Sequence, residues 1–109
     1  MKILNNIDEM KSIVANHKIA LLYITSESCN VCKVIFPRLK SLLESFPEIK
    51  AVRADIQELP LLSGEYNIFT IPCILAFAEG KEILREARYI DLEKLRAQLE
   101  RTYQLLFEE

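Results

Sequence analysis

The sequence predicts a small α/β fold in which helices cover both faces of a mixed central sheet. Apolar runs of strand length alternate along the chain with amphipathic segments of helical period, in the order α-β-α-β-α-β-β-α. The last two strands are joined only by the turn at Glu79-Gly80, so they should pair antiparallel, whereas strands joined through a helix should run parallel. We therefore expect a central mixed sheet of four strands, or at most five.

The first half of the chain predicts two helices around a buried strand. Residues 6–18 form an amphipathic helix by their apolar spacing, and residues 19–25 are a near-continuous apolar run, as in a strand buried on both faces. Residues 30–46 again carry apolar side chains at helical spacing. Pro37 should kink this second helix because its ring removes a backbone hydrogen bond, and Pro47 should end it.

The second half of the chain predicts the rest of the sheet and a last helix. Its segments are a strand at 49–56, a short helix at 59–66, a strand within 68–78 that Pro72 introduces, and a returning strand at 81–87. Asp91 is a good N-cap for the last helix, because its carboxylate can accept hydrogen bonds from the free N–H groups of the first turn. Four leucines share one face of that helix: Leu92, Leu95, Leu99 and Leu106.

Composition limits the classes to which the protein can belong. Its 109 residues suit a single domain, 1–109, and half of them are hydrophobic, which is enough for a core without metal or cross-links. The net charge of −2 and the lack of a Lys/Arg block argue against binding to nucleic acid or to a membrane surface. We see no secretory signal or membrane span, and three cysteines are an odd number for a disulfide scaffold, so we expect a cytoplasmic protein.

The pair Cys29 and Cys32 is the feature that carries chemistry. It lies between a predicted strand and a predicted helix, so the first sulfur should sit at a helix N-terminus and the second one turn inside. Free N–H groups and the helix dipole favour a thiolate at that position. We predict that Cys29 is the nucleophile of a disulfide exchange and that Cys32 is the resolving thiol. The alternatives are two inert core cysteines or a pair that is only a relic of the fold.

Two charged neighbours of the cysteine pair are accessory candidates. Lys33, one turn into the predicted helix, adds positive charge near the thiols, whereas the negative charge of Glu27 opposes it. If the Glu27 side chain points inward, its carboxylate could accept the proton that Cys32 must lose before it attacks a mixed disulfide.

Cys73, directly after Pro72, has two interpretations. It is either a buried strand residue that behaves as a small hydrophobe, which we favour, or a third thiol close to the Cys29–Cys32 pair. The three cysteines and His17 would compose a zinc-binding set on paper, but His17 should lie at the far end of the strand that precedes the pair. We therefore expect no metal site.

Three spacings resemble those of the thioredoxin family, over residues 7–106. They are Pro37 placed eight residues after Cys29, Tyr66-Asn67-Ile68 placed before Ile71-Pro72, and the run Phe77-Ala78-Glu79-Gly80-Lys81. The corresponding family features are the kink of the active-site helix, a Tyr-Gly-Ile run before a cis-proline, and a Phe-x-x-Gly hairpin. The resemblance implies a thioredoxin fold, with helices on both faces of a mixed central sheet.

The resemblance also implies a groove for a substrate chain. A cis bond at Pro72 would bring the backbone of Ile71 beside Cys29, where its N–H and C=O groups could pair with an extended substrate segment. Asn30 and Val31, between the two cysteines, would then belong to the same contact surface. Without the family, Pro72 would be an ordinary proline at the start of a strand.

Four sites around the thiols depart from the family pattern. They are Ser28 in place of an aromatic residue, Asn30-Val31 in place of Gly-Pro, Tyr23 in place of a buried aspartate, and Arg88 near the position of a glycine. A tyrosine at position 23 cannot accept a proton near neutral pH, so Cys32 should lose its proton more slowly than in the family. Arg53 stands where the family often has a lysine, and it could either steady the thiolate or project into solvent.

Together these features predict a thiol–disulfide oxidoreductase of the thioredoxin type that acts on disulfide-containing protein substrates. The dithiol needs no bound cofactor, and its electrons would come from a thioredoxin reductase or a small thiol. The four departures keep a second class open, a thioredoxin-fold binding or regulatory module with weak or absent redox turnover. A glutathione-dependent enzyme is disfavoured, because no clear basic set for glutathione stands out.

Overall fold

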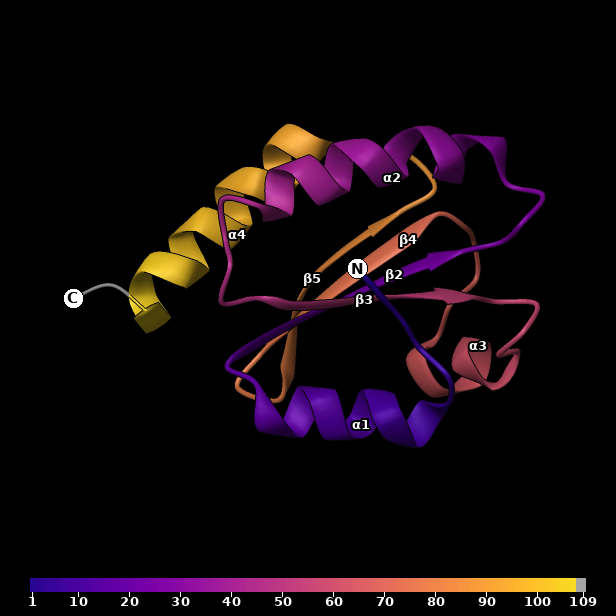
Figure 1. Ribbon diagram of the computed structural model, residues 1–109, viewed down its shortest axis with the longest axis horizontal. Coiled ribbons are helices and arrows are strands. Elements are labelled where there is room, and N and C mark those ends of the chain that lie inside the picture. The colour runs from indigo at the N-terminus through magenta and orange to yellow at the C-terminus, as the bar shows by residue number, and fades with distance from the viewer. Residues whose placement is uncertain (108–109) are drawn as a thin grey trace.

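The computed structural model describes residues 1–107, in which a five-stranded sheet lies between two layers of helices (Figure 1). The elements in chain order are β1 (Lys2–Ile3), α1 (Ile7–Asn16), β2 (Ile19–Thr25), α2 (Asn30–Leu43), β3 (Lys50–Asp55), α3 (Leu61–Tyr66), β4 (Cys73–Ala78), β5 (Lys81–Ala87) and α4 (Leu92–Phe107). Helices α2 and α4 cover one face of the sheet, and α1 and α3 lie against the other. Within residues 1–107 no helix is both long and apolar enough to cross a membrane.

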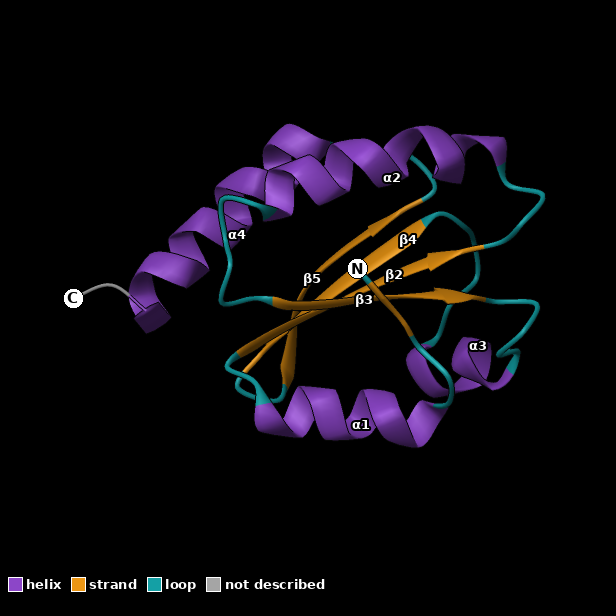
Figure 2. Cartoon of the chain, viewed as in Figure 1, coloured by secondary structure: helices purple, strands orange, loops and turns teal. Residues whose placement is uncertain are grey.

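The sheet is mixed, with β2 at its centre (Figure 2). The strand order is β1-β3-β2-β4-β5, in which β1, β3 and β2 are mutually parallel and β4 is antiparallel to both β2 and β5. Glu79 and Gly80 join β4 to β5 with φ angles of 49° and 85°, the left-handed geometry that two-residue hairpin turns require. The predicted mixed sheet between two helical layers is therefore confirmed, with five strands.

Strand β1 is the element that the sequence analysis missed. Its two residues pair with Val52 and Arg53 of β3, and the N–H of Leu4 donates to the Arg53 carbonyl at 2.8 Å. Both residues of β1 are exposed, and two residues are too few to show an alternation of apolar and polar side chains, so the sequence pattern did not reveal this strand. The strand forms because β3 offers an unpaired edge to the N-terminal segment.

Helix ends differ from the prediction by a few residues, and one cap agrees with it. Helix α2 ends at Leu43 rather than at residue 46, because the N–H groups of residues 44–46 donate to carbonyls three positions back. Helix α3 begins at Leu61, two residues late. The Oδ1 atom of Asp91 accepts a hydrogen bond from the Lys94 N–H at 3.0 Å, which confirms the predicted N-cap of α4.

Strand β4 begins at Cys73, directly after Pro72, as the sequence predicted. Asn67 adopts a left-handed conformation, with a φ of 54°, and this ends α3. Pro72 has no N–H to contribute to a strand ladder. The segment 68–72 therefore lies outside the sheet.

Two apolar clusters form the core, one on each face of the sheet. Strand β2 alternates between them: Ile19, Leu21 and Tyr23 belong to the cluster with α2 and α4, and Ala20, Leu22 and Ile24 belong to the cluster with α1 and α3. All six side chains are inaccessible to solvent. Because both faces are covered, the strand has no polar face, and its sequence is a continuous apolar run.

Candidate active site

A disulfide joins Cys29 and Cys32 at the start of α2, with their Cα atoms 5.3 Å apart. Cys29 is the N-cap of the helix, and its Sγ atom accepts a hydrogen bond from the Cys32 N–H at 3.1 Å. The Cys29 side chain is half-buried, whereas Cys32 is only 2% exposed. The pair lies where the sequence predicted it, and a sulfur that arrives from solvent reaches Cys29 first.

The turn between β2 and α2 aims Cys29 outward. The Cys29 N–H donates to the carbonyl of Ser26 at 3.1 Å, and the buried Ser26 side chain has its Oγ 3.3 Å from the Oγ of Ser28. These contacts close a compact turn immediately before the helix. When the disulfide is reduced, the free N–H groups and the dipole of a 14-residue helix stabilise a thiolate at its N-cap.

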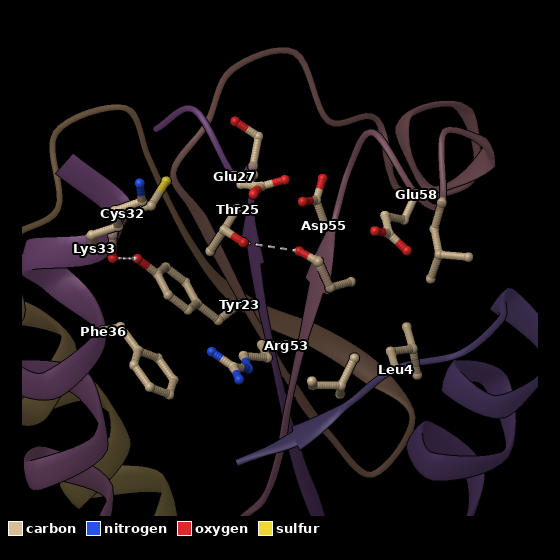
Figure 3. Close-up of a pocket in the computed structure, with 14 residues that line it drawn as sticks. Leu4, Tyr23, Thr25, Glu27, Cys32, Lys33, Phe36, Arg53, Asp55 and Glu58 are labelled. Atoms are coloured by element: carbon tan, nitrogen blue, oxygen red, sulfur yellow. Dashed lines mark hydrogen bonds between the residues drawn. The ribbon is translucent and has the colours of Figure 1, made fainter. Parts of the chain in front are cut away.

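Tyr23 lies beside Cys32 (Figure 3). Its hydroxyl donates to the backbone carbonyl of Cys32 at 2.8 Å, and its ring stacks on Phe36 with centroids 6.4 Å apart and planes 6° apart. Burial raises the pKa of the Tyr23 phenol to about 12. The phenol therefore stays protonated at neutral pH, where it holds the first turn of α2 but accepts no proton.

A pocket of about 650 Å³ opens beside Cys32, between α2 and the carboxyl ends of β2 and β3 (Figure 3). Its inner wall includes Tyr23, Phe36 and Leu4, and its polar side chains include Glu27, Lys33, Arg53, Asp55 and Glu58. The sequence analysis did not predict this pocket, because one wall comes from the unpredicted N-terminal segment and another from the loop after β3. The pocket gives water a route to the buried side of the cysteine pair.

The charged accessory candidates all line this pocket. Arg53 is half-buried, and its guanidinium lies over the Phe36 ring, 4.5 Å from the ring centroid. Arg53, Phe36 and Tyr23 thus form a continuous stack that ends at Cys32, an arrangement that neither of the predicted roles for Arg53 included. Lys33 and Glu27 are exposed on the pocket wall near the thiols.

Four residues were expected to contact substrate, two at the start of α2 and two just before β4. Asn30 and Val31 are exposed in the first turn of α2, and Val31 is 55% exposed. The Ile71–Pro72 peptide bond is cis, and Pro72 is buried while Ile71 is half-buried. Within residues 1–107 the backbone N–H and C=O of Ile71 make no hydrogen bond, so both are free for an incoming chain.

Cys73 lies on the opposite face of the sheet from Cys32. It is 1% exposed, belongs to the core cluster with α1 and α3, and pairs in register with Ile24 of β2. Burial raises the pKa of its thiol. These observations favour a small hydrophobe, and they provide no third thiol next to the pair.

His17 is remote from all three thiols. It follows α1 just before β2 begins, whereas the cysteine pair follows the other end of that strand, and its Nδ1 lies 3.0 Å from the Ile13 carbonyl oxygen. In the described part of the chain, 1–107, no group of three His, Cys, Asp or Glu side chains could hold a metal ion.

Comparison with known sequences gives a consistent result. The thioredoxin family model matches residues 2–101. A thioredoxin-like protein, YdfQ, of Bacillus subtilis is 33% identical over 102 residues, which cover 94% of this chain and 91% of that protein. Thioredoxin-2 of Pyricularia oryzae is 30% identical over 80 residues, which cover 73% of this chain and 47% of that protein.

Solved structures show the same fold. A thioredoxin of Plasmodium falciparum superposes with a TM-score of 0.83 at 20% identity and covers 90% of this chain and 98% of its own. The thioredoxin of Fasciola hepatica gives a TM-score of 0.84 at 19% identity, over 94% of this chain and 99% of its own.

Proposed function

The chain belongs to the thioredoxin family, and we propose that its reaction runs through Cys29 as the nucleophile and Cys32 as the resolving thiol. The protein is a thiol–disulfide oxidoreductase with a Cys29–Cys32 pair. One observation carries the division of roles: Cys29 is half-buried at the helix N-cap, whereas Cys32 is almost fully covered. Attack on a large disulfide substrate requires the accessible sulfur, and attack within the mixed disulfide does not.

The proposed exchange takes place in two steps. In the reduced protein, the Cys29 thiolate attacks one sulfur of the substrate disulfide, so that an S–S bond to substrate forms, the substrate bond breaks, and the leaving thiolate takes up a proton. Cys32 then loses its proton and attacks Cys29 Sγ, which closes the protein disulfide and releases the second substrate thiol. Two electrons pass from the dithiol to the substrate, and no further cofactor takes part in this transfer.

Proton removal from Cys32 is the step in which this chain differs from the family pattern. Tyr23 cannot accept the proton, because burial keeps its phenol neutral. The pocket beside Cys32 supports water as the carrier, and Glu27 on the pocket wall is the carboxylate nearest in sequence to the pair. We assign Glu27 as the group that receives the Cys32 proton, relayed by water that enters the pocket.

Substrate binding is assigned to the edge formed by Ile71, Pro72, Asn30 and Val31. The free N–H and C=O groups of Ile71 suit an extended substrate chain that pairs with the segment just before β4. The exposed Val31 offers apolar contact on the other side of Cys29. This surface fits a polypeptide that carries a disulfide.

Members of the family act on disulfide-containing proteins and are reduced by reductases. For this chain we propose a thioredoxin reductase or a small thiol as the electron donor, and a cytoplasmic location. The unpaired Cys73 supports a reducing compartment, since it leaves an odd number of thiols.

A redox titration in dithiothreitol and glutathione buffers, with mass spectrometry to identify the paired cysteines, tests the proposal. We expect one reversible Cys29–Cys32 disulfide with a potential between about −200 and −270 mV. Failure to form a reversible pair, or a pair that includes Cys73, would refute the mechanism.

The second candidate, a binding module with weak turnover, rests on the neutral Tyr23 beside Cys32. It makes a different prediction for Cys29→Ser, in which partner capture should survive. In the enzyme, both disulfide reduction and covalent capture of substrate should be lost.

A further inference from the structure

Arg88, the first residue after β5, has a backbone conformation that an arginine rarely adopts. Its φ angle is 68°, in the left-handed region where the Cβ atom crowds the following carbonyl. Asn67 and Glu79 share a positive φ, but Asn67 ends a helix and Glu79 is part of a hairpin turn. Arg88 is the central residue of a three-residue turn in which the Tyr89 N–H donates to the Ala87 carbonyl at 2.8 Å. This turn accounts for the backbone conformation, but it does not require a bulky cation at position 88, and strained residues of this kind concentrate at functional sites.

Backbone contacts place Arg88 at the end of the sheet where the carboxyl end of β2 leads to the cysteine pair. Its N–H donates to the carbonyl of Pro72 at 2.8 Å. The residue before it, Ala87, pairs with Cys73, which in turn pairs with Ile24 near the carboxyl end of β2. Arg88 is therefore two strand spacings, about 10 Å, from the end of β2, on the edge where Ile71 leaves its backbone groups free.

The Arg88 side chain is presented to solvent without a carboxylate partner. Its guanidinium lies 5.5 Å from the ring centroid of Tyr89, a side chain that is itself 81% exposed. Within residues 1–107 it makes no ion pair, and the nearby carboxylates are engaged elsewhere: Glu86 accepts from the Asp91 N–H and lies 3.9 Å from the Lys94 Nζ. The guanidinium is thus held over an aromatic ring with its donors free.

Arg85, three residues earlier on β5, shows the contrast. Its guanidinium donates to the Glu82 carboxylate and to the carbonyls of Tyr66 and Asn67, at distances between 2.7 and 3.1 Å. Arg85 therefore links β5 to the C-terminal end of α3. Arg88 performs no comparable internal task.

We propose that Arg88, supported by Tyr89, is a specificity-determining residue that binds a carboxylate in the substrate segment beside the reacting disulfide. The inference rests on the proposed function, since the substrate chain must lie along the edge that carries Ile71. A guanidinium fork pairs with a carboxylate through two parallel hydrogen bonds, and the ring beneath it restricts the fork to one face. The protein then reacts fastest with disulfides flanked by Asp or Glu.

Matched peptides test this directly. Each contains one disulfide, and the two members of a pair differ only by Glu or Gln at one position next to a cysteine, with each flanking position sampled in turn. We expect the reduced protein to react about five- to tenfold faster with the Glu peptide at one position, an effect that weakens as salt is added. Arg88→Gly should abolish this preference, and Arg88→Glu should reverse it.

Two controls separate this inference from the proposed function. Lys81→Gln removes a cation at the opposite end of the same strand and should keep the preference. The rate with hydroxyethyl disulfide, an uncharged small substrate, should be the same in Arg88→Gly as in the unaltered protein. If the unaltered protein does not reduce this substrate at all, the redox function itself is refuted. Equal rates for all Glu and Gln pairs in the unaltered protein, or a preference that survives Arg88→Gly, would overturn the role of Arg88.

Discussion

Two buried cysteines on opposite faces of one sheet, Cys32 and Cys73, show how position controls the chemistry of a thiol. Cys32 lies in the cluster with α2 and α4, one turn inside a helix, bonded to a second sulfur and beside a pocket. Cys73 lies in the cluster with α1 and α3, inside a strand and among apolar side chains. Burial alone therefore does not make a cysteine inert. The adjacent sulfur, the helix N-terminus and the water route distinguish the reactive face from the structural one.

The largest expected effect is a loss of exchange activity, and it should follow only from a substitution on the face of the sheet that α2 and α4 cover. Cys29→Ser should reduce the rate of disulfide exchange by more than about a thousandfold, because a hydroxyl is not an equivalent nucleophile. Cys73→Ser should leave the rate per folded molecule within about twofold. Stopped-flow reduction of a peptide disulfide measures both rates. An equal loss in the two variants would remove the distinction between the faces.

The next effect is on stability and lies on the other face. Cys73→Ser places a hydroxyl among apolar side chains and should lower the free energy of unfolding by about 1–3 kcal/mol. Cys73→Ala, which introduces no polar atom, should cost less. Urea unfolding of the two variants measures this. If serine were the better tolerated residue, the environment of Cys73 would be more polar than the described core.

Tyr23 provides a test with a defined pH dependence. Its folded-state pKa of about 12 exceeds the ordinary pKa of tyrosine, 10.0, so the unfolded chain releases this proton first as the pH rises. The contribution of protonated Tyr23 to the free energy of unfolding is thus fully present below pH 10.0, and it is lost as the pH rises towards 12. Tyr23→Phe should remove this alkaline loss and, through the missing hydrogen bond to Cys32, cost about 1 kcal/mol at neutral pH.

Equilibrium unfolding of both proteins between neutral and alkaline pH measures the Tyr23 effect. The pH–rate profile of exchange below pH 9 serves as the control, because a phenol that does not titrate there cannot shape it. A profile that changes with Tyr23→Phe would mean that the phenol takes part in proton transfer.

The smallest expected effect concerns Glu27. Glu27→Gln should slow resolution of the mixed disulfide by about threefold near neutral pH, and the difference should vanish at alkaline pH, where hydroxide removes the proton. The rate of substrate thiol release as a function of pH measures this. An identical profile for both proteins would exclude Glu27 and leave water alone as the acceptor.

Much of the candidate site was predictable because it depends on local order in the chain. The Cys29–Cys32 spacing after an apolar run and before a helical pattern places one sulfur at a helix start, whatever the rest of the molecule does. The preference for an inert Cys73 agrees with its buried place in β4. The pocket was not predictable, since Leu4 and Glu58 come from segments without a periodic pattern.

The sequence by itself determined the order of the elements that follow β1, the hairpin turn, the N-cap at Asp91 and the redox pair, because period, caps and spacing act over a few residues. Only the tertiary structure decided which face of the sheet each cysteine occupies. A strand buried on both faces is apolar at every position, so its sequence does not show which alternate side chains point to which face of the sheet. The hydrogen bond from Tyr23 to Cys32 and the difference between Arg85 and Arg88 likewise depend on which segments meet across the sheet.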